Sequence, residues 1–161
     1  QDNEISWFDW DHADASLIDF TRRAIAFRGE HPVFRRRGWF KGRRIHGRGV
    51  SDIAWFSTDG SEMSEEHWGQ GFAKSFGVFF NGEALGTTDE GGRQSKDDSF
   101  LLLFNAHVDP VEFTLPGPPF GKRWTLAIDT SAEDAFATST THEAGARIER
   151  PGLSLMVVKR S

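Results

Sequence analysis

The sequence has no cysteine, no tyrosine and no long hydrophobic run. The absence of cysteine excludes disulfides and Cys-based zinc sites and fits a reducing compartment. No apolar stretch approaches the ~20 residues that cross a bilayer, and no secretory signal is visible. We therefore expect a cytoplasmic protein with no membrane partner. The net charge of −5 over 161 residues also argues against nucleic acid as a partner.

Large aromatic rings dominate the hydrophobic residues that are present. The chain has 15 Phe and 6 Trp, and 37% of its residues are hydrophobic, which suffices for the core of one ordinary domain. Rings fill cores, but exposed rings also bind sugars, because the C–H face of a sugar packs on an aromatic face. Both interpretations stay open for any single ring.

The first eleven residues hold Trp7, Phe8 and Trp10 and begin with Gln rather than Met. So many rings in one terminal segment need a surface on which to pack. We therefore expect the chain to be a piece of a longer protein.

A helix is predicted over residues 15–28. Its apolar residues recur at spacings of three and four and are expected to form one broad stripe: Leu17, Ile18, Phe20, Ala24, Ile25 and Phe27. Asp14 or Ser16 can cap its start. Gly29 is expected to supply a left-handed cap at its end, and Pro32 cannot continue the helix.

Residues 35–48 carry seven Arg or Lys and no acid, so the rest of the chain sums to −12 (−5 minus 7). Trp39 and Phe40 interleave rings with these charges, as in proteins that bind single-stranded nucleic acid or other polyanions. Glycines within the same run indicate a surface loop. We favour a solvated loop whose cations pair with acids, and polyanion binding remains the alternative.

After residue 49 the pattern changes to short strands separated by turn sequences. The expected strands are Asp52–Phe56, Phe76–Phe80, Ser99–Ala106, Val111–Leu115, Trp124–Asp129 and Leu153–Lys159. Ser99–Phe104 is a continuous apolar run, which is typical of a central strand buried on both faces. Trp124, Leu126 and Ile128 alternate with other residues and are expected to share one face.

Two long polar segments, 83–98 and 131–147, are expected to be mobile loops. Six or more short strands without helices between them predict a mainly β fold, an antiparallel β-sandwich or barrel.

No pair of acids has the setting of a glycosidase, which needs two carboxylates roughly 5–10 Å apart. Asp97 and Asp98 are adjacent at a strand start, so their side chains should point to opposite faces. Glu62, Glu65 and Glu66 are expected to be solvated or capping acids. We assign no catalytic residue to this chain.

Motifs for other chemistries are also missing. The six histidines are scattered and none form an HxxxH pair, so neither a metal site nor a cofactor is expected. Ser75 lies in Ala73-Lys74-Ser75-Phe76-Gly77, which nearly matches a nucleophile elbow, but a strand is expected after it where the elbow needs a helix. No Walker or dinucleotide motif is present.

Several colinear blocks carry a resemblance. They are Gln1–Trp10, His31–Arg37, Asp52–Phe56, Asp59–Met63, Trp68, Phe79–Gly82, Asp97–His107, Trp124 and Asp129–Thr130. Each block is weak by itself, but their common order is specific. Together they resemble the C-terminal portion of the bacterial glycogen-debranching, isoamylase-like branch of the α-amylase superfamily.

The resemblance implies a protein with an N-terminal sandwich, a central (β/α)₈ barrel and a C-terminal β-sandwich. Residues 1–44 would be the end of the barrel, with residues 15–28 as its last helix, and residues 45–161 would be the C-terminal β-sandwich. The missing barrel of the same protein is then an expected partner. The helix at 15–28 would be exposed without it and prone to artefactual oligomers.

The same resemblance implies that the full-length protein hydrolyses α-1,6 branch linkages in glycogen or limit dextrin by a retaining double displacement, with an α-glucan as substrate. The catalytic carboxylates of the family lie on earlier barrel strands and have no matching position here. Only Asp2, Asn3 and Glu4 are expected near the sugar cleft, at the C-terminal face of the barrel. The alternative is that Asn3 and Glu4 only fix the loop before the helix.

A stand-alone α-glucan-binding module is the alternative function. It needs two or three solvent-facing rings aligned on one face. The candidate rings are Trp39, Phe40, Trp55, Trp68 and Trp124. Of these, Trp124 is expected in the core because of its alternation with apolar residues.

Overall fold

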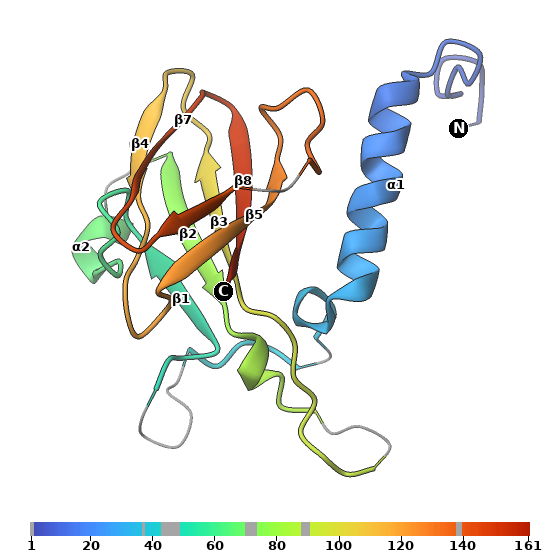
Figure 1. Cartoon of the computed structure of the whole chain (residues 1–161). Coiled ribbons are helices and arrows are strands. Elements are labelled where there is room, and N and C mark those ends of the chain that lie inside the picture. Colours follow the sequence, from blue (N-terminus) through green and yellow to red (C-terminus); the bar gives the residue numbers. More distant parts are fainter. Residues whose placement is uncertain (1, 37, 43–48, 70–73, 88–90, 138–139) are drawn as a thin grey trace.

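The computed structural model describes residues 2–36, 38–42, 49–69, 74–87, 91–137 and 140–161. Its body is a six-stranded antiparallel sheet in the order β1-β2-β3-β8-β5-β6, accompanied by a two-stranded ribbon of β4 and β7 (Figure 1). The strands are β1 (Ile53–Phe56), β2 (Ser75–Phe80), β3 (Phe100–Asn105), β4 (Val111–Thr114), β5 (Arg123–Asp129), β6 (Thr141–Glu143), β7 (Arg147–Arg150) and β8 (Ser154–Arg160). The predicted antiparallel β-sandwich is confirmed.

Each of the six predicted strands is present, and two short strands were missed. The prediction of a loop over 131–147 was wrong in part, because β6 lies inside it and β7 begins at its end. Neither strand shows a strong sequence pattern: β6 has only three residues, and β7 has Ile148 as its one apolar side chain. They form because β6 pairs with β5, and β7 pairs with β4.

One face of the large sheet, called here the closed face, is covered by the β4–β7 ribbon. The core on this face consists of side chains from the sheet and from the ribbon side: Ala54, Phe56, Phe79, Leu101, Leu103, Phe113, Leu115, Phe120, Trp124, Met156 and Val158. Trp124 is fully buried, and its indole N–H donates to the Pro116 carbonyl at 3.0 Å. The ring is therefore fully buried with its polar N–H hydrogen-bonded, as a core Trp requires.

The opposite face of the sheet, called here the open face, is covered only in part. Val33, Leu85, Phe100, Ile128 and Val157 form a smaller core there, with other apolar side chains half-buried around it. Strand β3 contributes to both cores through alternate residues, as predicted for a central strand.

A β-bulge in β5 corrects the predicted alternation of that strand. The register with β8 shifts between Leu126 and Ile128. An extra residue in one strand turns the following side chains to the other face. Trp124 and Leu126 therefore pack on the closed face, while Ile128 packs on the open face.

Helix α1 (Ala15–Glu30) confirms the predicted helix, with Asp14 as its N-cap. The left-handed cap predicted at Gly29 is wrong. Gly29 lies within the helix, and His31 ends it with an extended backbone conformation. The short 3₁₀ helix η1 (Pro32–Arg35) follows at once and buries Val33.

The two sides of α1 have different surroundings, so the predicted single stripe is wrong. Phe20 and Phe27 lie on the side toward the sandwich, where the Phe27 and Phe100 ring centroids are 5.5 Å apart. At 100° per residue, Ile18 and Ile25 lie on the opposite side. They are 39% and 66% exposed.

Candidate functional site

The predicted substrate-proximal residues Asp2, Asn3 and Glu4 are exposed in a turn before α1. The Asn3 side-chain carbonyl accepts a hydrogen bond from the Ile5 backbone N–H at 3.1 Å, and the Asp2 carboxylate accepts one from the Trp7 indole. Asn3 and Asp2 therefore hold the turn, and their place relative to a sugar cleft stays a prediction.

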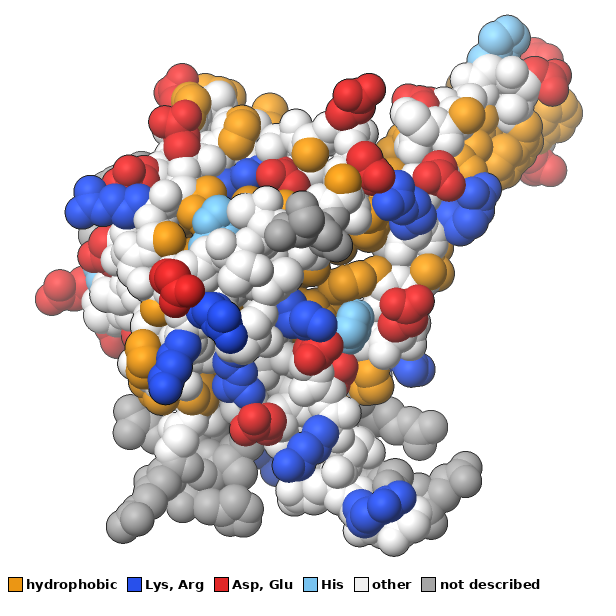
Figure 2. All heavy atoms as spheres, in the orientation of Figure 1, with side chains coloured by type: hydrophobic (Ala, Val, Ile, Leu, Met, Phe, Trp, Pro, Cys, Tyr) orange, Lys and Arg blue, Asp and Glu red, His pale blue; other side chains and the backbone are white. Residues whose placement is uncertain are grey.

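Hydrophobic side chains gather over this N-terminal segment and α1 in Figure 2. The most exposed large ones are Ile5, Trp7, Trp10 and Ile25, each at least 65% exposed. Patches of this kind mark surfaces that contact another protein, a membrane or a ligand.

Ser75 has no catalytic setting. It begins β2, and its hydroxyl donates to the Asn105 side-chain carbonyl at 2.8 Å. A strand follows it, as predicted, so its backbone is not that of a nucleophile elbow.

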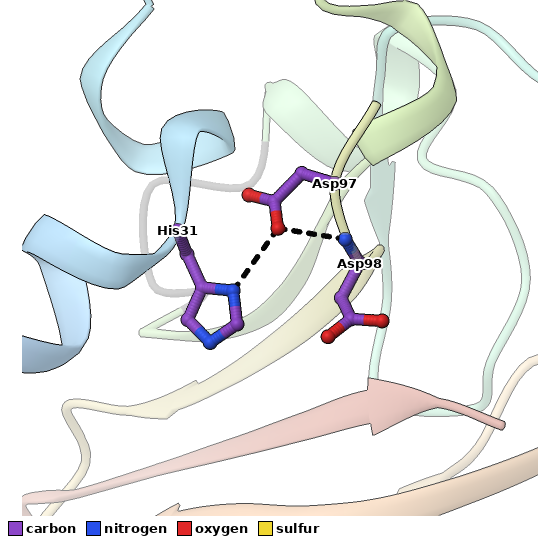
Figure 3. Close-up of side chains that lie close together, drawn as sticks. All are labelled: His31, Asp97 and Asp98. Atoms are coloured by element: carbon purple, nitrogen blue, oxygen red, sulfur yellow. Dashed lines mark hydrogen bonds and ion pairs between the residues drawn. The ribbon is translucent and has the colours of Figure 1, made fainter. Parts of the chain in front are cut away.

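His31, Asp97 and Asp98 form the one group of potential metal ligands found within the described ranges, with ligand atoms within 4.8 Å of one another (Figure 3). The Asp97 carboxylate lies 3.0 Å from His31 Nδ1 and accepts a hydrogen bond from the Val33 backbone N–H at 2.8 Å. Asp98 instead meets the Lys159 ammonium at 3.2 Å.

These interactions identify the cluster as a structural connection. Asp97 ties the end of α1 and the start of η1 to the segment that enters β3. Gly82 lies directly behind this segment, where a Cβ would sit 2.1 Å from the Asp98 carbonyl oxygen. A cation would have to displace contacts that already satisfy both carboxylates.

Two buried ion pairs link other elements. Arg36, part of the predicted basic loop, pairs with Asp52 at 3.3 Å, and both side chains are less than 10% exposed. Pairing with an acid is as predicted, but solvation is wrong for Arg36. Other members of the basic run, at 37 and 43–48, lie outside the described residues.

Arg150 on β7 pairs with Asp129 on β5 and also donates to the Ser131 hydroxyl at 2.8 Å. Burial raises the pKa of Asp129, but hydrogen bonds from Arg150 and Ser131 outweigh it and lower the pKa overall. This pair joins the ribbon to the large sheet.

A cleft of about 400 Å³ separates the first turns of α1 from the segment after β5. Its apolar side includes Phe20 and Phe136, and Arg23 spans it to form an ion pair with Asp134 at 2.8 Å. The Arg23 guanidinium also lies 4.5 Å from the centre of the Phe136 ring. The cleft is therefore bridged by contacts that hold the helix to the sandwich.

Of the five predicted sugar-binding rings, the structure brings two together. Trp55 on β1 and Trp68 on helix α2 (Glu65–Trp68) have ring centroids 5.3 Å apart. Phe76 and Phe104 extend this pair across the sheet, and sequence reasoning missed them because only strand register makes them neighbours. We call Trp68, Trp55, Phe76 and Phe104 the aromatic row.

The remaining three rings lie elsewhere. Trp124 is in the closed-face core, as predicted. Phe40 stacks on Phe80 at 5.1 Å, beneath the Arg36 guanidinium. Trp39 is 93% exposed.

The model of the family "Isoamylase, C-terminal" matches residues 52–158, which contain strands β1 to β7 and most of β8. The chain belongs to this family. An isoamylase C-terminal domain thus accounts for the sandwich, and α1 and η1 precede the matched region.

The relatives of this isoamylase C-terminal domain include a glycogen operon protein, an isoamylase and a glycogen debranching enzyme. The glycogen operon protein GlgX homolog of Mycobacterium tuberculosis is 42% identical over 164 residues, covering 100% of this chain. The isoamylase of Pseudomonas amyloderamosa is 27% identical and covers 80% of the chain. The glycogen debranching enzyme of Serratia proteamaculans is 27% identical and covers 85%.

The chain spans 23%, 15% and 17% of the length of these three relatives, respectively. No helix among the described residues is long and apolar enough to cross a membrane.

Proposed function

We propose that this chain is the non-catalytic C-terminal part of an enzyme that hydrolyses α-1,6 branch linkages in glycogen or limit dextrin. The observation that carries the proposal is the 42% identity that runs through the whole chain to a glycogen operon protein. It includes α1 and η1 as well as the sandwich.

In this proposal residues 1–44 belong to the end of a catalytic barrel and residues 45–161 to the C-terminal sandwich. The two-sided helix α1 supports this division, because a helix shared between two bodies needs an apolar side toward each. Phe27 meets the sandwich, and Ile18 and Ile25 would meet the barrel. Asp2, Asn3 and Glu4 would then lie near the sugar cleft of a cytoplasmic enzyme.

The chain by itself contributes no hydrolytic chemistry in this proposal. Retaining glycosidases hold a nucleophile and an acid/base carboxylate on either side of the scissile bond. The well-buried carboxylates of Asp97 and Asp129 are engaged with His31 and Arg150. Carboxylates held in this way serve the fold.

An activity assay tests the proposal. The 161-residue chain is incubated with a branched limit dextrin, and released linear chains are measured by reducing ends and by chain-length profiling. We expect no release, whereas a longer protein that adds a barrel to these residues should debranch the same substrate. Release by the 161 residues alone, or no debranching by the longer protein, would overturn the proposal.

A stand-alone α-glucan-binding module is the second candidate, favoured by the aromatic row and its exposed Trp68. The sequence preceding residue 1 distinguishes the two candidates. A barrel with an Asp nucleophile and a Glu acid/base supports the first, and a different preceding domain supports the second.

A further inference from the structure

The aromatic row lies on the open face of the sheet and crosses three strands. Phe76 on β2 is the register partner of Phe104 on β3, and their rings stack with centroids 5.1 Å apart. Trp55 on β1 continues the row, 5.7 Å from Phe76. Trp68 ends it beyond the first strand of the sheet.

Among the described residues, the rings of α1 and η1 contact Phe80, Phe100 and Phe136 rather than the aromatic row. Val33 and Phe27 pack near Phe100, at the opposite end of β3 from Phe104. The rings within the row are half-buried, and Trp68 is 54% exposed. The four rings thus hold one another in place, and Trp68 is the most exposed of them.

Polar groups border the aromatic row at its Trp68 end. Helix α2 presents the exposed carboxylates of Glu65 and Glu66 in the same turn. The turn is fixed, because the Ser64 backbone N–H donates to His67 Nδ1 at 3.0 Å. Hydrogen-bond acceptors at the edge of an aromatic surface match the chemistry of a sugar, whose rim carries hydroxyls and whose flat side is apolar.

We propose that the aromatic row is an α-glucan-binding surface, with Trp68 as its main stacking residue and Glu65 and Glu66 as acceptors for sugar hydroxyls. The choice of α-glucan rests on the proposed function above. The surface binds without reacting, and it is separate from the Asp2–Glu4 turn, because α2 and the N-terminal segment lie on different sides of the molecule (Figure 1). Its effect would be to hold a branched polymer near the enzyme while the catalytic part acts.

Isothermal titration of the 161-residue chain with maltoheptaose tests the surface. We expect measurable binding, and a Trp68→Ala variant should bind about tenfold more weakly because it loses an exposed stacking ring. Trp68→Phe keeps a ring and should recover most of the affinity. Trp39→Ala is the matched control: it removes another highly exposed Trp outside the row and should bind within twofold of wild type.

The other possible results would each overturn the proposal that the aromatic row binds glucan. Absence of binding by the wild-type chain overturns it, and so does an equal loss in the Trp68→Ala and Trp39→Ala variants. Unchanged glucan affinity in Trp68→Ala, together with a lower melting temperature of a longer barrel-containing protein, would identify the row as a protein contact instead. Circular dichroism confirms that each variant is folded.

Failure of this surface and failure of the proposed function give different results. Debranching by the longer protein together with no titration signal leaves the proposed function standing and removes the surface. Binding without debranching by the longer protein removes the proposed function and identifies a glucan module.

Discussion

The two faces of the large sheet differ in what covers them. The closed face is covered from within the family domain, by the β4–β7 ribbon and by the loop that carries Phe120. The open face is covered in part by η1 and one side of α1, which precede the matched region, and in part by Leu85 and Phe136 within it. Trp68, at the edge of the aromatic row, is 54% exposed. This difference predicts that most of the stability of the domain comes from the closed face.

The largest expected effect is on the closed face, in Trp124→Ala. The substitution leaves a ring-sized cavity and an unpaired Pro116 carbonyl in the fully buried core. We expect the free energy of unfolding to fall by about 3–5 kcal/mol. Urea denaturation followed by Trp fluorescence and circular dichroism measures it. A loss below about 1 kcal/mol would mean that this face is not the main source of stability.

The next effect concerns the tie between ribbon and sheet, in Asp129→Asn. Removing one charge from the buried pair leaves the Arg150 guanidinium without its anionic partner, and we expect a loss of about 3 kcal/mol at neutral pH. The measurement is chemical denaturation at a series of pH values, with Glu112→Gln as a control in the exposed Arg147–Glu112 pair.

The stability lost in Asp129→Asn should depend on pH, because the pKa of Asp129 is lowered in the folded wild type. A carboxyl whose pKa is lower in the folded state stabilises the fold above its unfolded pKa of about 3.9, and this stabilisation is lost as the pH falls through the folded value. The difference between wild type and Asp129→Asn should therefore be full above about pH 4 and shrink below it. A constant difference down to pH 2 would contradict the assignment.

A smaller effect is expected on the open face, in Phe27→Ala. The ring is only half-buried against Phe100 and Phe34, so we expect a loss of about 1–2 kcal/mol. Hydrogen exchange distinguishes the two faces. The amides of α1 should exchange faster while those of β3 and β8 stay protected, and uniform loss of protection would show that the helix is integral to the sheet.

The smallest effect is expected for Ile25→Ser, on the exposed side of α1. Because Ile25 is 66% exposed, the melting temperature of the 161-residue chain should change by no more than the equivalent of about 0.5 kcal/mol. Sedimentation of concentrated samples tests the same residue for self-association. In a longer protein with a barrel, the same substitution should destabilise measurably, and equal small effects in both proteins would remove Ile25 from the proposed barrel contact.

Much of the fold was predictable because local patterns agree with it. The apolar run at Ser99–Phe104 became the central strand β3, and Asp14 capped α1 as its position before the apolar residues indicated. The misses have tertiary causes. β7 is held by its pairing with β4. The bulge before Ile128 turns this side chain to the open face, whereas strict alternation would have placed it on the closed face.

The candidate site was less predictable than the fold. Trp55 and Trp68 were identifiable as rings, but only the β1–β2–β3 register shows that Phe76 and Phe104 lie beside them. The contact of His31 with Asp97 joins residues 66 positions apart, and no spacing in the sequence indicates it. Long-range pairing decides both, and a single sequence carries no direct signal for it.

Strand order has a consequence for the biosynthesis of this domain. β8 is made after every other described strand, yet it lies between β3 and β5 and pairs with both. While the ribosome has not yet released it, β1–β3 and β5–β6 are separate pieces with unpaired edges. Chaperone capture is therefore most useful until β8 has emerged and paired, and a nonsense codon even a few residues before Ser154 should leave aggregating fragments in place of a shortened domain.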